Sequence, residues 1–299
     1  MSRYILAVDQ STQGTKGLLF DEDGALVCRA DRPHRQIISP LGWVSHDPEE
    51  IRQNTLAVCR DTVEKAGIDK GSIAAFGISN QRETTVAWDG ETGKSICDAI
   101  VWQCARAEAV CERLSGMADT VRARTGLNLS PYFPAAKMGW IMENVPEAKA
   151  LADAGRLRLG TVDSWLLSFL TRERVHATDY SNASRTQIFD ITALRWDEEL
   201  CRAFGVPAGA LPEVRMSDSV FGTTDLGGYL DEPIPVCGVL GDSHGALFGQ
   251  DCRRPGQVKA TYGTGSSVMM NIGTEPRFSP GGLVTSLAWG MNGRVEYVF

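Results

Sequence analysis

The sequence predicts an α/β protein in which helices cover a largely buried sheet. Apolar runs of strand length alternate with helix-like segments along most of the 299 residues, which is the pattern of a covered sheet. The order strand–turn–strand occurs near the N-terminus and again near residue 260, and both turns contain Gly, Ser or Thr. The content of 43% hydrophobic and 22% charged residues is typical of an ordinary globular protein of this class.

The chain is expected to open with a meander of three strands. Residues 4–8 are a continuous apolar run that ends in Asp9, which predicts a central strand whose last residue lies at a sheet edge. We interpret residues 10–16 as a polar turn and residues 17–20 as the returning strand. A further turn leads into the third strand at residues 25–27.

Helices and strands alternate after the meander. A helix is predicted from Pro48 to about residue 66, because Asp47 suits the N-cap and a proline suits the first helical position. Further helices are predicted at residues 135–144, 146–154, 162–170 and 245–250, and strands at residues 73–79, 84–88, 99–102, 236–240, 258–262 and 267–271. Residues 205–235 contain Gly and Pro and are predicted to be looser. The two hairpins predict two related sheets that face one cleft.

The composition excludes several classes of protein. A net charge of −7 argues against a nucleic-acid partner, since Lys and Arg are scattered among carboxylates rather than gathered in a stripe. No apolar run reaches the roughly 18 residues of a membrane span. The first strand follows residue 3 too closely for an export signal, so we expect a cytoplasmic protein. The eight cysteines form no CxxC pair and are interpreted as reduced, mostly buried thiols.

The two Gly/Ser/Thr turns are candidates for phosphate binding. Such a turn can direct several backbone N–H groups and hydroxyls at one point, and Lys16 adds a cation to the first turn. One turn alone is more often a plain loop. Two turns, with Asp9 and Asp242 each closing a buried strand, favour a site. A P-loop is excluded, because Trp88 stands where the motif ending at residues 93–95 requires a glycine.

Six motifs resemble, in order, those of the glycerol kinases in the FGGY carbohydrate kinase family. They are VDQSTQGTK (8–16), NQRET (80–84), IVWQC (100–104), GTVDSW (160–165), TDYSNASRT (178–186) and TYGTG (261–265). The resemblance implies an actin-like ATPase (ribonuclease H-like) fold, with a mixed sheet, flanking helices and ATP between two domains. Residues 1–252 would be the N-terminal kinase domain with the polyol site and the first phosphate loop. Residues 253–299 would begin a C-terminal nucleotide-binding domain that is incomplete in this sequence.

The resemblance also implies cofactors and site residues. ATP and Mg²⁺ are the expected cofactors, and a small polyol or sugar is the expected substrate. Thr12, Gln13, Gly14 and Lys16, with Thr264 facing them from the second hairpin, are expected around the nucleotide phosphates, and Asp9 near Mg²⁺. Arg82, Glu83, Trp102, Tyr132, Asp242 and Ser243 are expected to line the polyol site, with Trp102 as an apolar wall against the carbon chain.

The chemistry of these residue types agrees with that assignment. A hydroxyl is a poor nucleophile at neutral pH, so a carboxylate must accept its proton as the P–O bond forms, and Asp242 is the candidate base. Arg82 and Glu83 supply donors and acceptors for adjacent hydroxyls. Without the family context, we would interpret Arg82 and Glu83 as a surface ion pair. We would interpret Trp102 and Tyr132 as ordinary core aromatic residues.

Two positions depart from the glycerol kinase pattern. Ser243 stands where the family usually has a glutamine, and Ser267 stands where it usually has a phenylalanine. Both changes enlarge the site and make it more polar. We therefore keep as an alternative a polyol or ketose longer than glycerol, such as erythritol, xylulose or ribulose.

The leading interpretation is a kinase that transfers the γ-phosphoryl group of ATP to a terminal hydroxyl of glycerol or a related polyol or sugar. A non-catalytic actin-like nucleotide-dependent switch and a sugar-binding half domain remain alternatives, since fold does not fix function. Members of the family continue beyond the point where this sequence stops. We therefore expect the 299 residues alone to be weakly active or inactive. A homo-oligomer is left open.

Overall fold

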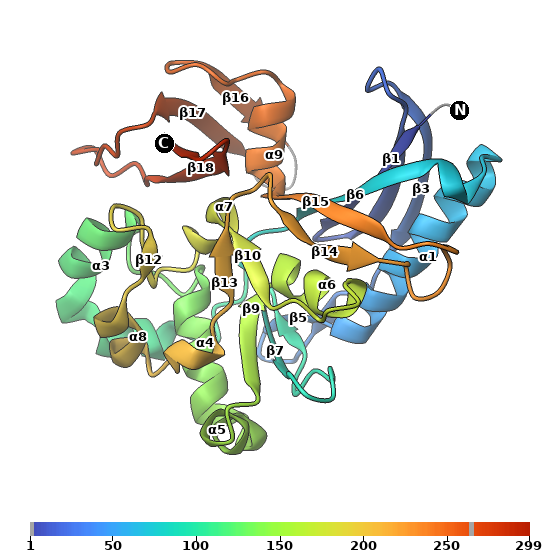
Figure 1. Ribbon diagram of the computed structural model, residues 1–299. Coiled ribbons are helices and arrows are strands. Elements are labelled where there is room, and N and C mark those ends of the chain that lie inside the picture. The colour runs from blue at the N-terminus through green and yellow to red at the C-terminus, as the bar shows by residue number, and fades with distance from the viewer. Residues whose placement is uncertain (1–2, 263–265) are drawn as a thin grey trace.

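A mixed six-stranded sheet forms the centre of the computed structural model, which describes residues 3–262 and 266–299 (Figure 1). Its order is β14-β15-β6-β1-β2-β3, in which β1 pairs parallel with β6 and β6 with β15, while the other pairs are antiparallel. The strands are β1 (Tyr4–Ser11), β2 (Gly14–Phe20), β3 (Leu26–Pro33), β6 (Ile73–Asn80), β14 (Val220–Thr224) and β15 (Ile234–Gly241).

Helix α1 (Pro48–Ala66) covers one face of this sheet (Figure 1). Asp47 caps its start by accepting a hydrogen bond from the Glu49 backbone N–H, and Gly67 ends it in the left-handed conformation. The helix approaches β2 closely at Gly17, where a Cβ atom would lie 2.4 Å from Thr62 Oγ1. Only glycine therefore fits at that contact.

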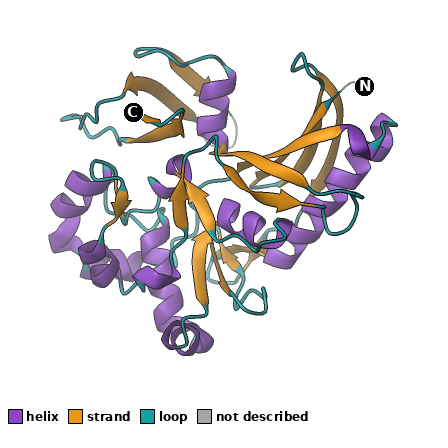
Figure 2. Cartoon of the chain, in the orientation of Figure 1, coloured by secondary structure: helices purple, strands orange, loops and turns teal. Residues whose placement is uncertain are grey.

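A second sheet of five strands and a group of helices form the lower part of the molecule in Figure 2. The sheet has the order β4-β5-β8-β7-β9, and all its pairs are antiparallel. Its strands are β4 (Ile37–Ile38), β5 (Val44–His46), β7 (Thr85–Asp89), β8 (Ala99–Ile100) and β9 (Leu157–Thr161). The helices are α2 (Glu108–Arg113), α3 (Ala118–Thr125), α4 (Pro134–Asn144), α5 (Pro146–Asp153) and α8 (Glu198–Phe204).

Several short elements complete these two parts. They are α6 (Val162–Leu170), α7 (Tyr180–Ala183), the parallel pair β10 (Ala177–Asp179) and β13 (Glu213–Arg215), the antiparallel pair β11 (Phe189–Asp190) and β12 (Arg195–Trp196), and 3₁₀ turns at Lys70–Ser72, Ser115–Met117 and Ala208–Ala210. Trp165 on α6 is buried against Trp88, with ring centroids 5.5 Å apart, and its Nε1 donates to the Pro48 carbonyl. These contacts tie α6 to β7 of the five-stranded sheet and to α1.

The C-terminal residues form a separate antiparallel sheet of order β16-β17-β19-β18, which lies beside α9 (Figure 1). Its elements are β16 (Val258–Thr261), β17 (Ser267–Gly273), β18 (Ser286–Met291) and β19 (Arg294–Val298), and α9 spans Asp242–Gly249. Leu287 and Tyr297 pack with Phe189 in one apolar cluster, and Trp289 packs with Leu247 of α9 in another. The sheet therefore rests on α7 and α9 rather than standing free.

Most predicted elements are confirmed, but the first turn is wrong. The predicted polar turn at residues 10–16 is mostly strand, because β1 continues to Ser11 and β2 begins at Gly14. Gln10 and Thr15 are fully buried polar residues inside the sheet. Asp9 is therefore not the last residue of its strand. It faces Lys16 across the β1–β2 pair.

The stretch 205–235 is more ordered than predicted. It contains β13, which pairs with the distant strand β10, and β14, which pairs with β15. The hydrogen bonds of these pairs give the stretch its order. No helix in the described ranges 3–262 and 266–299 is long and apolar enough to cross a membrane.

Candidate active site

Two connected hollows lie between the β1–β2 hairpin and the β16–β17 hairpin. The hairpin cleft, of about 810 Å³, is lined by residues 11–16 of the first hairpin, among others. The inner pocket, of about 370 Å³, is lined by Gln81, Arg82, Glu83, Tyr132, Ser243, Ser266 and Ser267 together with the shared residues. Thr12, Trp102, Asp242 and Thr261 line both hollows. The two hairpins thus face one cavity system, as predicted.

Asp242 stands at the junction of the two hollows. It is the first residue of α9, directly after β15 ends. Its Oδ1 accepts hydrogen bonds from Arg82 Nε at 3.1 Å and from the Ser243 backbone N–H at 2.6 Å. The carboxylate is 39% exposed but sits deep in the cleft, and burial raises its pKa above the ordinary value, while the Arg82 charge acts in the opposite direction.

Arg82 follows β6 and crosses the end of the neighbouring strand to reach Asp242. Its Nη2 donates to Ser243 Oγ at 3.1 Å. The crossing depends on Gly241, where a Cβ atom would lie 2.6 Å from Arg82 Cγ and 2.7 Å from Cδ. A side chain at residue 241 would therefore displace the arginine.

Glu83 is a buried carboxylate between two guanidinium groups. It is 2% exposed, and its Oε1 accepts from Arg185 Nε at 2.6 Å and lies 3.9 Å from Arg82 Nη1. Its φ of +64° is unusual for a residue other than glycine. Such backbone strain is typical of functional sites. Arg185 in turn lies over the Phe133 ring, 5.1 Å from its centroid.

Trp102 and Tyr132 form an aromatic wall of the inner pocket. Their ring centroids are 5.5 Å apart, and Trp102 Nε1 donates to Thr12 Oγ1 at 2.9 Å. This hydrogen bond joins the wall to the tip of the first hairpin. Burial is the main reason that the pKa of Tyr132 rises to about 12, so the phenol keeps its proton at neutral pH.

The predicted phosphate-loop residues lie along the hairpin cleft. Thr12, Gln13, Gly14 and Lys16 all line it. Gly14 has no room for a side chain, since a Cβ atom would lie 2.6 Å from the Arg32 carbonyl oxygen. The predicted residue Thr264 lies outside the described residues, although Thr261 and Ser266 on either side of it line the hollows.

Asp9 is held beside the cleft by two neighbouring strands. Its Oδ2 accepts from Lys16 Nζ at 2.7 Å, and its Oδ1 accepts from Ser79 Oγ at 3.2 Å. Within residues 3–262 and 266–299, no group of three or more His, Cys, Asp or Glu side chains is placed to hold a metal ion. A single carboxylate is nevertheless enough for Mg²⁺ when phosphate oxygens and water complete its shell. The Asp9 carboxylate, beside a cleft lined by the first hairpin, therefore has the ligand chemistry of a Mg²⁺-bound nucleotide phosphate site.

The predicted site omitted a buried network that supports it. Asp179 accepts hydrogen bonds from Ser181 Oγ at 2.9 Å, from Asn182 Nδ2 at 2.9 Å and from Ser217 Oγ at 2.7 Å. Ser181 Oγ then accepts from the Gly241 backbone N–H at 2.9 Å. The residue just before Asp242 is therefore fixed by this carboxylate.

The same network also reaches β6 and the C-terminal sheet. The amides of Asn182 and Asn80 exchange two hydrogen bonds, of 2.9 and 3.1 Å, two residues before Arg82. The Gly290 backbone N–H of β18 donates to Ser217 Oγ at 3.1 Å. The only sequence signal for this network is the polar motif at residues 178–186, to which the sequence analysis assigned no role.

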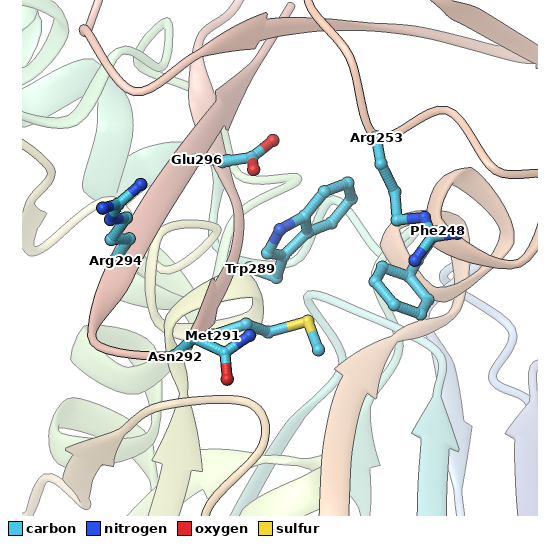
Figure 3. Close-up of a pocket in the computed structure, with 7 residues that line it drawn as sticks. All are labelled: Phe248, Arg253, Trp289, Met291, Asn292, Arg294 and Glu296. Atoms are coloured by element: carbon cyan, nitrogen blue, oxygen red, sulfur yellow. The ribbon is translucent and has the colours of Figure 1, made fainter.

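A further hollow, of about 420 Å³, lies on the C-terminal sheet and shares no lining residue with the other two (Figure 3). Phe248, Arg253, Trp289, Met291, Asn292, Arg294 and Glu296 line it. Glu296 accepts from Asn271, and Arg253 pairs with Asp251. Because the side chains of Glu296 and Arg253 already have these partners, this hollow is a weaker candidate for chemistry than the cleft around Asp242.

Comparison with known proteins identifies the family. The sequence model of the FGGY family of carbohydrate kinases, N-terminal domain, matches residues 4–249. The chain belongs to this family. It is 49% identical over 297 residues to glycerol kinase 1 of Thermotoga maritima, covering 99% of this chain and 60% of the relative. It is 48% identical over 296 residues to the glycerol kinase of Symbiobacterium thermophilum, covering 98% and 59% respectively.

Solved structures support the same fold. The crystal structure of Plasmodium falciparum glycerol kinase with ADP superposes with a TM-score of 0.92 at 34% identity, covering 99% of this chain and 60% of that one. The gluconate kinase of Lactobacillus acidophilus superposes with a TM-score of 0.86 at 20% identity, covering 100% and 59%. The fold is the predicted actin-like ATPase fold with a ribonuclease H-like mixed sheet. The chain spans about 60% of the length of the curated relatives it matches.

Proposed function

We propose that this FGGY-family chain carries the acceptor site and the first phosphate hairpin of an ATP-dependent kinase that phosphorylates a terminal hydroxyl of glycerol or a related polyol. The observation that carries this proposal is the position of Asp242, which lines both the hairpin cleft and the inner pocket. A hydroxyl bound in the inner pocket would lie next to this base and face the phosphate-binding hairpin. The likeness to glycerol kinases, one of them solved with ADP, supports the same reaction.

Asp242 would act as the general base. Its carboxylate accepts the proton of the acceptor hydroxyl as the new P–O bond forms. The raised pKa makes it a stronger base than an exposed aspartate. Arg82 holds Oδ1 by a charge-assisted hydrogen bond, and the second oxygen, Oδ2, would accept the proton.

The inner pocket would recognise the acceptor by its hydroxyls and its carbon chain. Arg82 and Ser243 offer donors, and the Glu83 carboxylate, fixed by Arg185, offers acceptors. The rings of Trp102 and Tyr132 would pack against the carbon atoms. Buried hydroxyls that lose water must find such partners, so this mixture of groups favours a polyol over an apolar alcohol.

The nucleotide would bind along the first hairpin. Thr12, Gln13, Gly14, Lys16 and Thr264 are the proposed phosphate ligands, and Asp9 is the proposed ligand of Mg²⁺. ATP supplies the transferable phosphoryl group, and Mg²⁺ neutralises the charge that develops on it. Lys16 and the hairpin amides then position the phosphates. We propose that residues 253–299 begin the second nucleotide-binding part and that residues 1–252 form the first domain.

A longer acceptor is the main alternative within this reaction. Ser243 and Ser267 both line the inner pocket with short polar side chains. An extra hydroxymethyl group could hydrogen-bond there, which favours erythritol, xylulose or ribulose over glycerol. A non-catalytic switch is less well supported, since such a protein would have no use for the Arg82, Glu83 and aromatic groups of the pocket.

The test is a measurement of kcat/KM for ATP-dependent phosphorylation of glycerol, erythritol, xylulose and ribulose, with Asp242→Asn as the variant. We expect a loss of about 10²- to 10⁴-fold in kcat for the variant, the usual contribution of a general base, with acceptor binding retained. Unchanged turnover in Asp242→Asn would refute the proposed role of this residue. A clear preference for glycerol would refute only the longer acceptor.

We further propose that the 299 residues alone bind ATP weakly and turn over slowly. The match covers 60% of the length of glycerol kinase 1 of Thermotoga maritima, and the proposal assumes that the remaining 40% of that relative contributes to nucleotide binding. A coupled ADP-release assay that gave a kcat of about 1–100 s⁻¹, the ordinary range for kinases, would contradict this.

A further inference from the structure

Lys137 is a fully buried cation next to the inner pocket. It lies in the first turn and a half of α4 and has no exposed surface. Burial of an amine is costly unless its hydrogen bonds are satisfied. Among the residues that the structure describes, no carboxylate lies within ion-pair distance of its Nζ. The side chain must therefore obtain its stabilisation from other groups.

Those groups are two backbone carbonyls just before the helix. Lys137 Nζ donates to the Pro131 carbonyl oxygen at 2.9 Å and to the Tyr132 carbonyl oxygen. Phe133, at the N-cap position, makes no side-chain capping bond, so the two bonds from Lys137 are the described side-chain hydrogen bonds that tie α4 to the segment just before it. Burial lowers the pKa of Lys137 to about 7, and its Nζ has enough N–H groups for both carbonyl acceptors.

The segment that Lys137 holds carries one wall of the pocket. The Tyr132 ring packs on Trp102 at 5.5 Å and on Phe133 at 5.1 Å. The Phe133 ring lies under Arg185, which in turn fixes the Glu83 carboxylate. A shift of this segment would therefore move both the aromatic wall and the Glu83 carboxylate.

We propose that Lys137 is a positioning residue, which fixes the segment of residues 131–133 and thereby sets the affinity of the inner pocket for the acceptor alcohol. The inference rests on the proposed function, since it takes the inner pocket to be the acceptor site. Lys137 itself does not line the pocket and is not a catalytic residue. Its effect should appear in acceptor binding more than in nucleotide binding, because Tyr132 and Glu83 line the inner pocket and neither lines the hairpin cleft.

The experiment compares Lys137→Met with the unchanged 299-residue chain by calorimetry. Methionine has a similar length and is apolar, so it removes the two donors with little change in volume. Lys149→Met is the matched control, since Lys149 is an exposed lysine on the neighbouring helix α5. Glycerol, erythritol, xylulose and ribulose are the acceptor probes, and ADP is the nucleotide probe. Circular dichroism at the temperature of the titration reports whether each variant is folded.

We expect Lys137→Met to bind the preferred acceptor at least tenfold more weakly, with ADP affinity within twofold and Lys149→Met unchanged in both. A purely structural lysine would lower the thermal midpoint without separating the two affinities. A folded Lys137→Met that binds the acceptor within twofold of the unchanged chain overturns the inference.

If Lys137→Met does not fold, Lys137→Leu, which also lacks donors, is judged by the same criteria. If neither variant folds, Lys137 maintains the fold rather than the pocket, and the inference is also overturned. An unchanged chain that binds none of the four alcohols refutes the proposed function instead. The two failures are therefore distinguishable.

Discussion

Replacement of Gly241 by alanine should separate Arg82 from Asp242 without altering either side chain. The added Cβ would lie 2.6 Å from Arg82 Cγ and 2.7 Å from Cδ, closer than carbon atoms approach in proteins. These atoms lie in the middle of the arginine side chain, so the guanidinium cannot stay in place while they move. The hydrogen bonds to Asp242 and Ser243, both 3.1 Å long, should break.

The expected magnitude follows from the bond that is lost. A hydrogen bond to a charged group contributes about 1.5–3 kcal/mol. Since about 1.36 kcal/mol corresponds to a tenfold change in rate, loss of the Arg82–Asp242 bond alone should lower kcat/KM by about 10- to 150-fold. The acid limb of the pH profile should also move. Arg82 lowers the pKa of Asp242, so its withdrawal raises that pKa further, and the base becomes protonated at higher pH.

The assay is coupled ADP release over a range of acceptor concentrations at each pH, which gives kcat/KM, with acceptor binding measured separately by calorimetry. Gly249→Ala is the matched control, because Gly249 ends α9, the helix that begins directly after Gly241, and a Cβ there meets nothing within 4 Å. A Gly241→Ala variant with kcat/KM within twofold of the unchanged protein and with the same acid limb would show that Arg82 does not act on Asp242.

Two other changes test the pocket and the core. Ser267→Phe should place an apolar wall in the inner pocket. The ratio of kcat/KM for glycerol to kcat/KM for ribulose should then rise by about tenfold, which is the effect of a methylene-sized difference in fit. An unchanged ratio would contradict the assignment of Ser267 to the acceptor pocket. Asp163 is buried, and burial followed by the nearby Asp179 charge raises its pKa to about 7. Because the unfolded chain ionises near 3.8 while the folded chain keeps its proton, the free energy of unfolding should fall as pH rises from about 4 to 7, by no more than about 4 kcal/mol. Asp163→Asn should flatten this dependence in urea titrations at pH 4, 5.5 and 7, and an equal slope in both proteins would reject the explanation.

Local sequence determined the elements whose signals lie within a few residues. The bounds of α1 follow from Asp47, Pro48 and Gly67, which act on the backbone groups of the helix they flank. The lengths of the two strands in the first hairpin could not be predicted in the same way. Gln10 looks like a turn residue, yet it is buried because its side chain accepts from Gln81, which lies 71 residues away. Contacts of that kind are not visible in a short window of sequence.

The sequence by itself determined the family, the residue types of the site and the two hairpins, because these are carried by contiguous motifs. Only the tertiary structure decided how they act together. Arg82 and Asp242 lie 160 residues apart and meet because β6 and β15 are parallel neighbours and Gly241 leaves room between them. The roles of Lys137 and Asp179 depend on burial and on partners in other segments, and a residue acquires these only when the chain has folded around it.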